Sequence, residues 1–82
     1  MSTVRKAVVD VWGGLLGSSI ESPEANFFDL GGDSLMMMNM LAEIESKLGL
    51  EITPGEVFDN PTFGSFCDHL EEELCRTAAK SV

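Results

Sequence analysis

The most informative stretch of this chain reads Asn26-Phe27-Phe28-Asp29-Leu30-Gly31-Gly32-Asp33-Ser34-Leu35. Its glycine pair allows a tight backbone turn and leaves no side chain in the way of an approaching partner. An apolar pattern of helical spacing follows, so Ser34 falls at or next to a helix N-terminus. Unpaired N–H groups and the helix dipole favour an anion such as phosphate there. The local chemistry predicts a serine hydroxyl presented for attachment of a phosphate-bearing group, although Asp33 and Ser34 could also simply cap the helix.

On both sides of this stretch, apolar residues recur at helical spacing. A capping box opens a short helix at Thr53-Pro54-Gly55-Glu56, and Gly17 and Gly49 are expected to end the helices before them. Strand-like alternation is absent from the sequence. We therefore predict an all-α fold, a small bundle of three main helices plus one short helix, as a single domain over 1–82. The expected helices span about 3–16, 34–48, 54–58 and 62–78, with a long loop at 17–33.

We expect the helices and the long loop all to contribute apolar side chains to the core. Trp12 lies beside the apolar stripe of the first helix and is expected to close the core. Long loops inside compact domains are usually functional or held in place, and three apolar loop residues are candidates to anchor this one: Phe27, Phe28 and Leu30. The last helix carries an apolar stripe made of Phe63, Phe66, Cys67, Leu70, Leu74 and Ala78.

The second predicted helix has two apolar faces. At about 100° per residue, one face is an ordinary core stripe made of Met37, Met40, Leu41, Ile44 and Leu48. The other, which we call the Met38 patch, lies on the side of Ser34 and consists of Leu35, Met38 and Ala42. Flexible methionine suits a surface that meets several partners. We expect the patch to bind partner proteins within an acidic rim of Asp33, Glu43 and Glu45; cover by loops or by the short helix is the alternative.

Composition limits the classes of partner. The chain has 82 residues and a formal net charge of −9, with 14 acidic against 5 basic residues. Nucleic acid is disfavoured because phosphate neutralisation needs Lys and Arg, whereas basic protein surfaces are favoured. No apolar run approaches the roughly 20 residues that span a bilayer. We therefore expect a cytoplasmic protein without a membrane partner.

The two cysteines do not predict a disulfide. Cys67 and Cys75 are eight residues apart in a helical pattern, or about 12 Å along the axis, and a disulfide needs Cα atoms within about 7 Å. With one histidine and no Cys-x-x-Cys spacing, the sequence predicts no metal site either. Both cysteines are expected to be thiols, with Cys67 in the core.

Taken whole, the run from Asn26 to Leu35 resembles the phosphopantetheine attachment motif of carrier proteins, and most of all the peptidyl carrier domains of nonribosomal peptide synthesis. The resemblance covers nearly the whole chain and implies an acyl-carrier-like fold. The supporting segments occur in the family's order: Val11-Trp12 with Leu15-Leu16-Gly17, Leu48-Gly49-Leu50 with Ile52, Val57-Phe58, and Asn60-Pro61-Thr62-Phe63.

The resemblance implies the chemistry as well. Ser34 would carry 4'-phosphopantetheine, derived from coenzyme A, with Gly31, Gly32 and Asp33 shaping the attachment turn. The arm's thiol would hold an aminoacyl, peptidyl or acyl group as a thioester, and the chain itself would catalyse nothing. The implied partners are a phosphopantetheinyl transferase, an adenylating loading enzyme, and condensation or tailoring enzymes. A methionine start and a single domain suggest a free-standing carrier that works in trans, although an excised domain would look similar. The carrier is expected to be a monomer.

Three other interpretations stay open at this point. Many peptidyl carriers have histidine where this chain has Asp33, so an acyl carrier of polyketide or fatty-acid type is the first alternative. Gly32-Asp33-Ser34-Leu35 also spells the signature of GDSL esterases, in which Ser34 would be a nucleophile activated by His69 and Asp68. The sequence opposes this interpretation, because such hydrolases present the serine after a strand in a much larger α/β fold and use an Asp-x-x-His arrangement instead of adjacent Asp68-His69. The last alternative is an unmodified acidic helical module that binds a protein.

Overall fold

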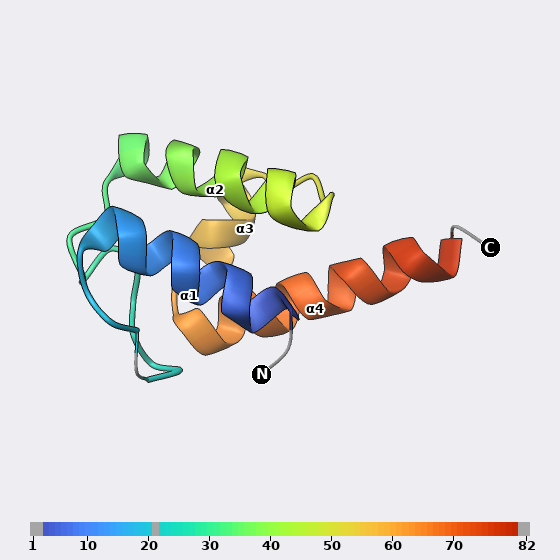
Figure 1. Ribbon diagram of the computed structural model, residues 1–82, viewed down its shortest axis with the longest axis horizontal. Helices are drawn as coiled ribbons and strands as arrows, with labels where there is room; N and C mark the ends of the chain where they lie inside the picture. The colour runs from blue at the N-terminus through green and yellow to red at the C-terminus, as the bar shows by residue number, and fades with distance from the viewer. Residues whose placement is uncertain (1–2, 21, 81–82) are drawn as a thin grey trace.

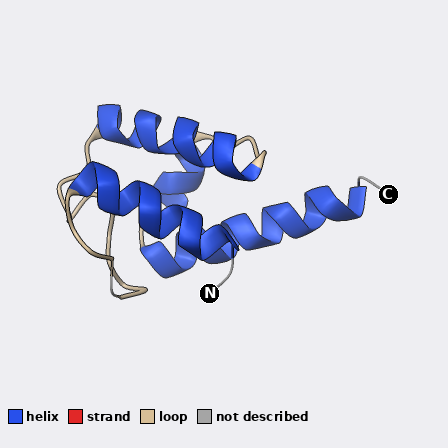
Figure 2. Ribbon diagram, in the orientation of Figure 1, coloured by secondary structure: helices blue, strands red, loops and turns tan. Residues whose placement is uncertain are grey.

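The computed structural model describes residues 3–20 and 22–80, with side chains to residue 76. Four helices make up these ranges: α1 (Thr3–Leu16), α2 (Ser34–Leu48), α3 (Pro54–Asp59) and α4 (Phe63–Lys80). Within the same ranges the sole β pairing is one isolated antiparallel bridge. Figure 2 shows helices joined by loops throughout. The predicted all-α bundle of three main helices and one short helix is thus confirmed.

The helices surround one core, and the chain between α1 and α2 lies at one end of it (Figure 1). α1 and α2 pack side by side, α4 packs against α1, and the short α3 packs against α2. The C-terminal half of α4 projects away from the other helices. The expected end of the last helix at about residue 78 is extended to Lys80, and that of the third from residue 58 to Asp59.

Glycines end the first two helices, as the sequence predicts. Gly17 follows α1 with φ +66°, and Gly49 caps α2 with φ +69°, a left-handed conformation that favours glycine. α3 begins with proline at its first position after Thr53, whose N–H donates to the Glu56 carboxylate at 2.6 Å. The capping box therefore forms as predicted.

An aromatic cluster forms the centre of the core. The indole of Trp12 is fully buried, with ring centroids 5.3 Å from Phe27, 5.9 Å from Phe63 and 5.9 Å from Phe66. Its Nε1 has no hydrogen-bond partner among the described residues. The expected α2 stripe is also buried or packed against this core. In α4 the same holds from Phe63 to Leu74, while Ala78 lies beyond the described side chains.

Both cysteines are free thiols, as predicted: Cys67 is buried in the core and Cys75 is exposed. Burial raises the pKa of the Cys67 thiol to about 12, so this group stays protonated at neutral pH. None of the helices in the described ranges is both long enough and apolar enough to span a membrane.

Candidate functional site

Ser34 is the first residue of α2 and is exposed to solvent. Asp33 precedes it as the N-cap in an extended conformation, and its carboxylate accepts the N–H of Met36 at 2.8 Å. The Asp33 carbonyl accepts the next N–H, that of Met37, also at 2.8 Å. Capping is therefore done by Asp33, and the Ser34 hydroxyl remains available at the positive end of the helix dipole.

The two glycines before Asp33 have different roles in the turn. Gly31 has φ +103°, a conformation that other residues adopt only with strain. Gly32 lies close to Phe27: its N–H donates to the Phe27 carbonyl at 3.0 Å. A Cβ on Gly32 would come within 2.3 Å of the Phe27 ring and 2.7 Å of the Phe27 carbonyl oxygen. The turn therefore needs glycine at both positions, once for φ and once for space.

We expect Gly32→Ala to destabilise the protein by about 1–3 kcal/mol, because the added methyl group displaces the fully buried Phe27. Urea denaturation measures the loss. Gly14→Ala in α1 is the matched control, because a Cβ at Gly14 would have no neighbouring atom within 4 Å. This variant should gain up to about 1 kcal/mol in free energy of unfolding. A Gly32→Ala variant as stable as the wild type would contradict the close packing of this turn.

The loop before Ser34 is fixed to the segment that leads into α4. Asn26 and Thr62 form the isolated bridge. Next to it, the Phe27 N–H donates to the Pro61 carbonyl at 2.9 Å, and the Phe63 N–H donates to the Ala25 carbonyl at 2.7 Å. Backbone hydrogen bonds thus hold the loop at the same place where the Phe27 side chain enters the core.

Asn26 also organises the turn that follows it. Its side-chain oxygen accepts the N–H groups of Phe28 at 2.9 Å and Asp29 at 3.2 Å, and its carbonyl accepts the Leu30 N–H at 3.0 Å. Of the three expected anchors, Phe27 is fully buried, Phe28 is half-buried against the core and Leu30 is half-buried. Phe27 is the main anchor.

The Met38 patch is exposed along α2, on the surface that also presents Ser34. Leu35 is 72% exposed, Met38 is 53% exposed, and Ala42 is exposed as well. Among the described residues, one further large apolar side chain is as exposed: Phe58 of α3, at 59%. Its ring stacks on Phe28 with centroids 5.5 Å apart. The sequence did not predict that Phe58 is exposed, because a six-residue helix is too short to show a second face.

The acidic residues expected around the patch are placed differently from one another. Asp33 is exposed beside Ser34. Glu43 is exposed but borders a hollow of about 380 Å³ between α1 and α2, together with Asp10 and Lys47. Glu45 is half-buried, and its carboxylate accepts the Ile52 N–H at 2.8 Å. The structure therefore gives Glu45 a role in fixing the chain after α2, which the sequence did not suggest.

The residues that an esterase would need are engaged elsewhere. The carboxylate of Asp68 accepts a hydrogen bond from Arg5 at 2.6 Å, and His69 Nε2 lies 2.6 Å from Glu56 Oε1. Hydrogen bonding and the nearby imidazole hold the pKa of Glu56 below its usual value, against the opposing effect of burial. Asp68 and His69, the two residues that would activate Ser34 in an esterase, thus each bind another side chain instead.

Known proteins resemble this chain in both sequence and fold. Residues 6–70 match the family described as "Phosphopantetheine attachment site". The chain is 31% identical over 69 residues, 84% of its length, to pyochelin synthetase PchE of Pseudomonas aeruginosa. It is 46% identical over 55 residues, 67% of its length, to a phenolphthiocerol/phthiocerol polyketide synthase of Mycobacterium tuberculosis.

The chain spans only 5% and 4% of the length of these two relatives. A solved structure described as a nonribosomal PCP domain superposes with a TM-score of 0.70 at 28% sequence identity. That superposition covers 83% of this chain and 87% of the solved one. The match therefore includes both the sequence around Ser34 and the arrangement of the helices.

Proposed function

This chain belongs to the family of phosphopantetheine attachment domains, whose members carry a covalently attached 4'-phosphopantetheine, and we propose that Ser34 is the residue that carries it. The main support for this proposal is that the Ser34 hydroxyl is exposed at the first position of α2, shortly after two glycines, which have no side chains. The neighbouring carboxylate of Asp33 accepts the Met36 N–H and so caps the helix, which leaves the Ser34 hydroxyl free of a capping role.

The residues of the turn would position the arm and take no part in chemistry. Gly31 shapes the turn through its positive φ and Gly32 through its close contact with Phe27, which holds the turn on the core. When attached, the arm supplies a terminal thiol that can hold an acyl group as a thioester. Tethering raises the effective concentration of that group at each partner. In this proposal the chain is a carrier and not an enzyme.

The position of the arm can be mapped directly. After incubation with coenzyme A and a broad-specificity phosphopantetheinyl transferase, trypsin should release residues 7–47 between Lys6 and Lys47 as one peptide. Tandem mass spectrometry should place the adduct on Ser34. An adduct on any other serine of the same peptide would contradict the assignment.

For the cargo, we propose aminoacyl or peptidyl intermediates of nonribosomal peptide synthesis. A synthetase and a PCP domain are among the similar proteins, and partners would include an adenylating loading enzyme and condensation or tailoring enzymes. The similarity to a polyketide synthase favours the second candidate, an acyl carrier. Loading of the modified chain by an adenylating enzyme, against loading by an acyltransferase, distinguishes the two.

We propose that the Met38 patch is where these enzymes dock. Small apolar surfaces beside acidic residues such as Asp33 allow weak contacts that exchange fast. Phe58 is a candidate addition to the patch because α3 packs against α2.

Met38→Glu should reduce arm attachment or cargo turnover about tenfold or more, because a charge replaces an apolar contact at the centre of the patch. Its thermal stability should change little, since the side chain is half in solvent. Asn39→Glu is the matched control, with an equal charge change at an exposed neighbouring position about 100° around α2. Steady-state kinetics with the transferase and melting curves are the measurements. A steep drop in melting temperature, or equal effects of both variants, would contradict the docking role.

A further inference from the structure

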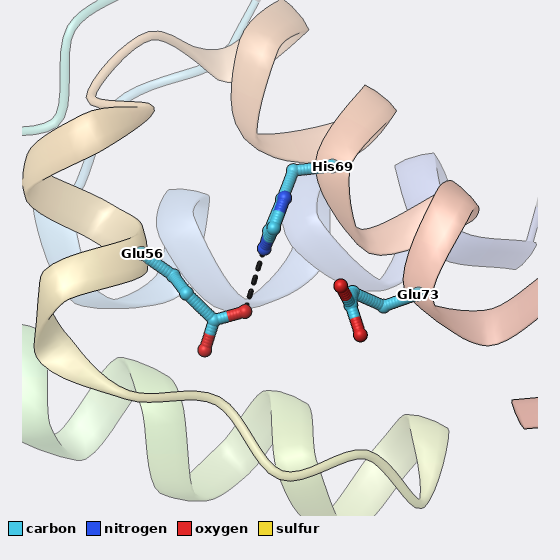
Figure 3. A group of neighbouring side chains, drawn as sticks. All are labelled: Glu56, His69 and Glu73. Carbon is cyan, nitrogen blue, oxygen red and sulfur yellow. Dashed lines mark hydrogen bonds and ion pairs between the residues drawn. The ribbon is translucent and has the colours of Figure 1, made fainter. Parts of the chain in front are cut away.

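Three side chains converge between α3 and α4, outside the attachment site (Figure 3). Glu56 comes from α3, and His69 and Glu73 come from α4. Their nearest ligand atoms, one imidazole nitrogen and two carboxylate oxygens, all lie within 4.8 Å of one another. We propose that these three side chains bind one divalent transition-metal ion of the Zn²⁺ class.

The kinds of ligand decide the class of ion. An imidazole nitrogen combined with carboxylates suits Zn²⁺ and its transition-metal neighbours, whereas Mg²⁺ and Ca²⁺ prefer all-oxygen sites. His69 and Glu73 are four residues apart, so α4 presents both on one face. The same i, i+4 spacing supplies paired ligands on the helices of zinc enzymes. Glu56 completes the set from a second helix, so the ion would join α3 to α4.

The geometry is partly organised before any ion arrives. The second carboxylate oxygen of Glu56 accepts the Thr53 N–H at 2.6 Å and lies 3.2 Å from the Thr53 hydroxyl. Such outer partners orient a ligand and strengthen its hold on a metal. The side chains of Glu56 and His69 are each 23% exposed, which leaves one side of the cluster open for water to complete the coordination.

Two existing contacts must give way to the ion. His69 Nε2 and Glu56 Oε1 are hydrogen-bonded at 2.6 Å. An ion would replace the hydrogen between them, and the two atoms would separate to the spacing of about 3 Å around a small ion. Glu73 also accepts from Arg76 at 2.9 Å; the Arg76 side chain is exposed to solvent, which weakens the pair. The net charge of −9 favours replacement of these contacts by a dication.

Titration calorimetry with zinc chloride tests the site on the full-length chain. Ser34→Ala and Cys75→Ser should be introduced first, because the thiol of an arm and the exposed Cys75 thiol would bind zinc themselves. Cys67 needs no change, since it is buried and protonated. We expect one ion per chain, and His69→Gln or Glu73→Gln should each weaken binding at least tenfold. Glu72→Gln is the matched control: it is exposed on α4 and also pairs with Arg76, and should alter affinity less than twofold.

Zinc binding that is absent, or equal in the His69→Gln, Glu73→Gln and Glu72→Gln variants, would overturn the proposal. Melting curves in chelator show whether each variant folds. If His69→Gln unfolds on losing its Glu56 contact, the Glu73→Gln variant still tests the proposal, because that change removes only an ion pair with the exposed Arg76 side chain. Since Ser34 is replaced throughout, neither outcome depends on arm attachment.

Discussion

Ser34→Ala should abolish attachment of the arm completely while leaving the fold intact. The substitution removes the proposed acceptor oxygen, so the phosphodiester bond to the arm cannot form at this position. Stability should change by less than about 0.5 kcal/mol, because the side chain is exposed and Asp33 supplies the helix cap. In-gel fluorescence after incubation with a labelled coenzyme A and the transferase measures attachment, and circular dichroism confirms folding.

Ser46→Ala is the control for that experiment. Ser46 is another exposed serine of the same helix, so its variant should be labelled as fast as the wild type. Labelling of a folded Ser34→Ala variant would place the arm on a different residue, and the glycine turn would then have a structural role only.

Phe27→Ala should cost about 3–5 kcal/mol of unfolding free energy, the range for deletion of a fully buried aromatic ring. The total free energy of unfolding of an 82-residue domain is roughly 4–12 kcal/mol, at 0.05–0.15 kcal/mol per residue. A large fraction of the variant molecules would therefore be unfolded in mild urea. The ring packs against Trp12 and Phe28, and its loss should also release the turn before Ser34. Urea denaturation followed by Trp12 fluorescence measures the effect.

Phe58→Ala provides the comparison. Its ring is 59% exposed and stacks on Phe28, so removal should cost about 1 kcal/mol. Equal losses from the two variants would show that Phe27 does not anchor the loop as its burial indicates.

The helical part of this fold could be predicted from sequence because its signals are local. Apolar residues at helical spacing identify the faces of α2, and Gly49 marks its end in a left-handed conformation. The position of Ser34 at the helix start followed from its neighbours alone. Exposure of the Met38 patch followed from counting turns from Ser34.

What the sequence did not reveal depends on residues far apart along the chain. The backbone hydrogen bonds from Phe63 to Ala25 and from Phe27 to Pro61 join segments more than 30 residues apart. The pattern of side chains along the sequence does not show which backbone groups pair. The contact of His69 with Glu56 likewise requires α3 and α4 to be placed first. For the same reason the sequence does not show that the Glu45 carboxylate accepts the Ile52 N–H.

We propose that one phosphopantetheine arm attaches to this chain, at Ser34. The most direct test is the intact mass of the purified protein before and after incubation with coenzyme A and a broad-specificity transferase. We predict a gain of one phosphopantetheine per chain, carried by residues 7–47 after digestion. A folded, initially unmodified protein that gains no mass would contradict it.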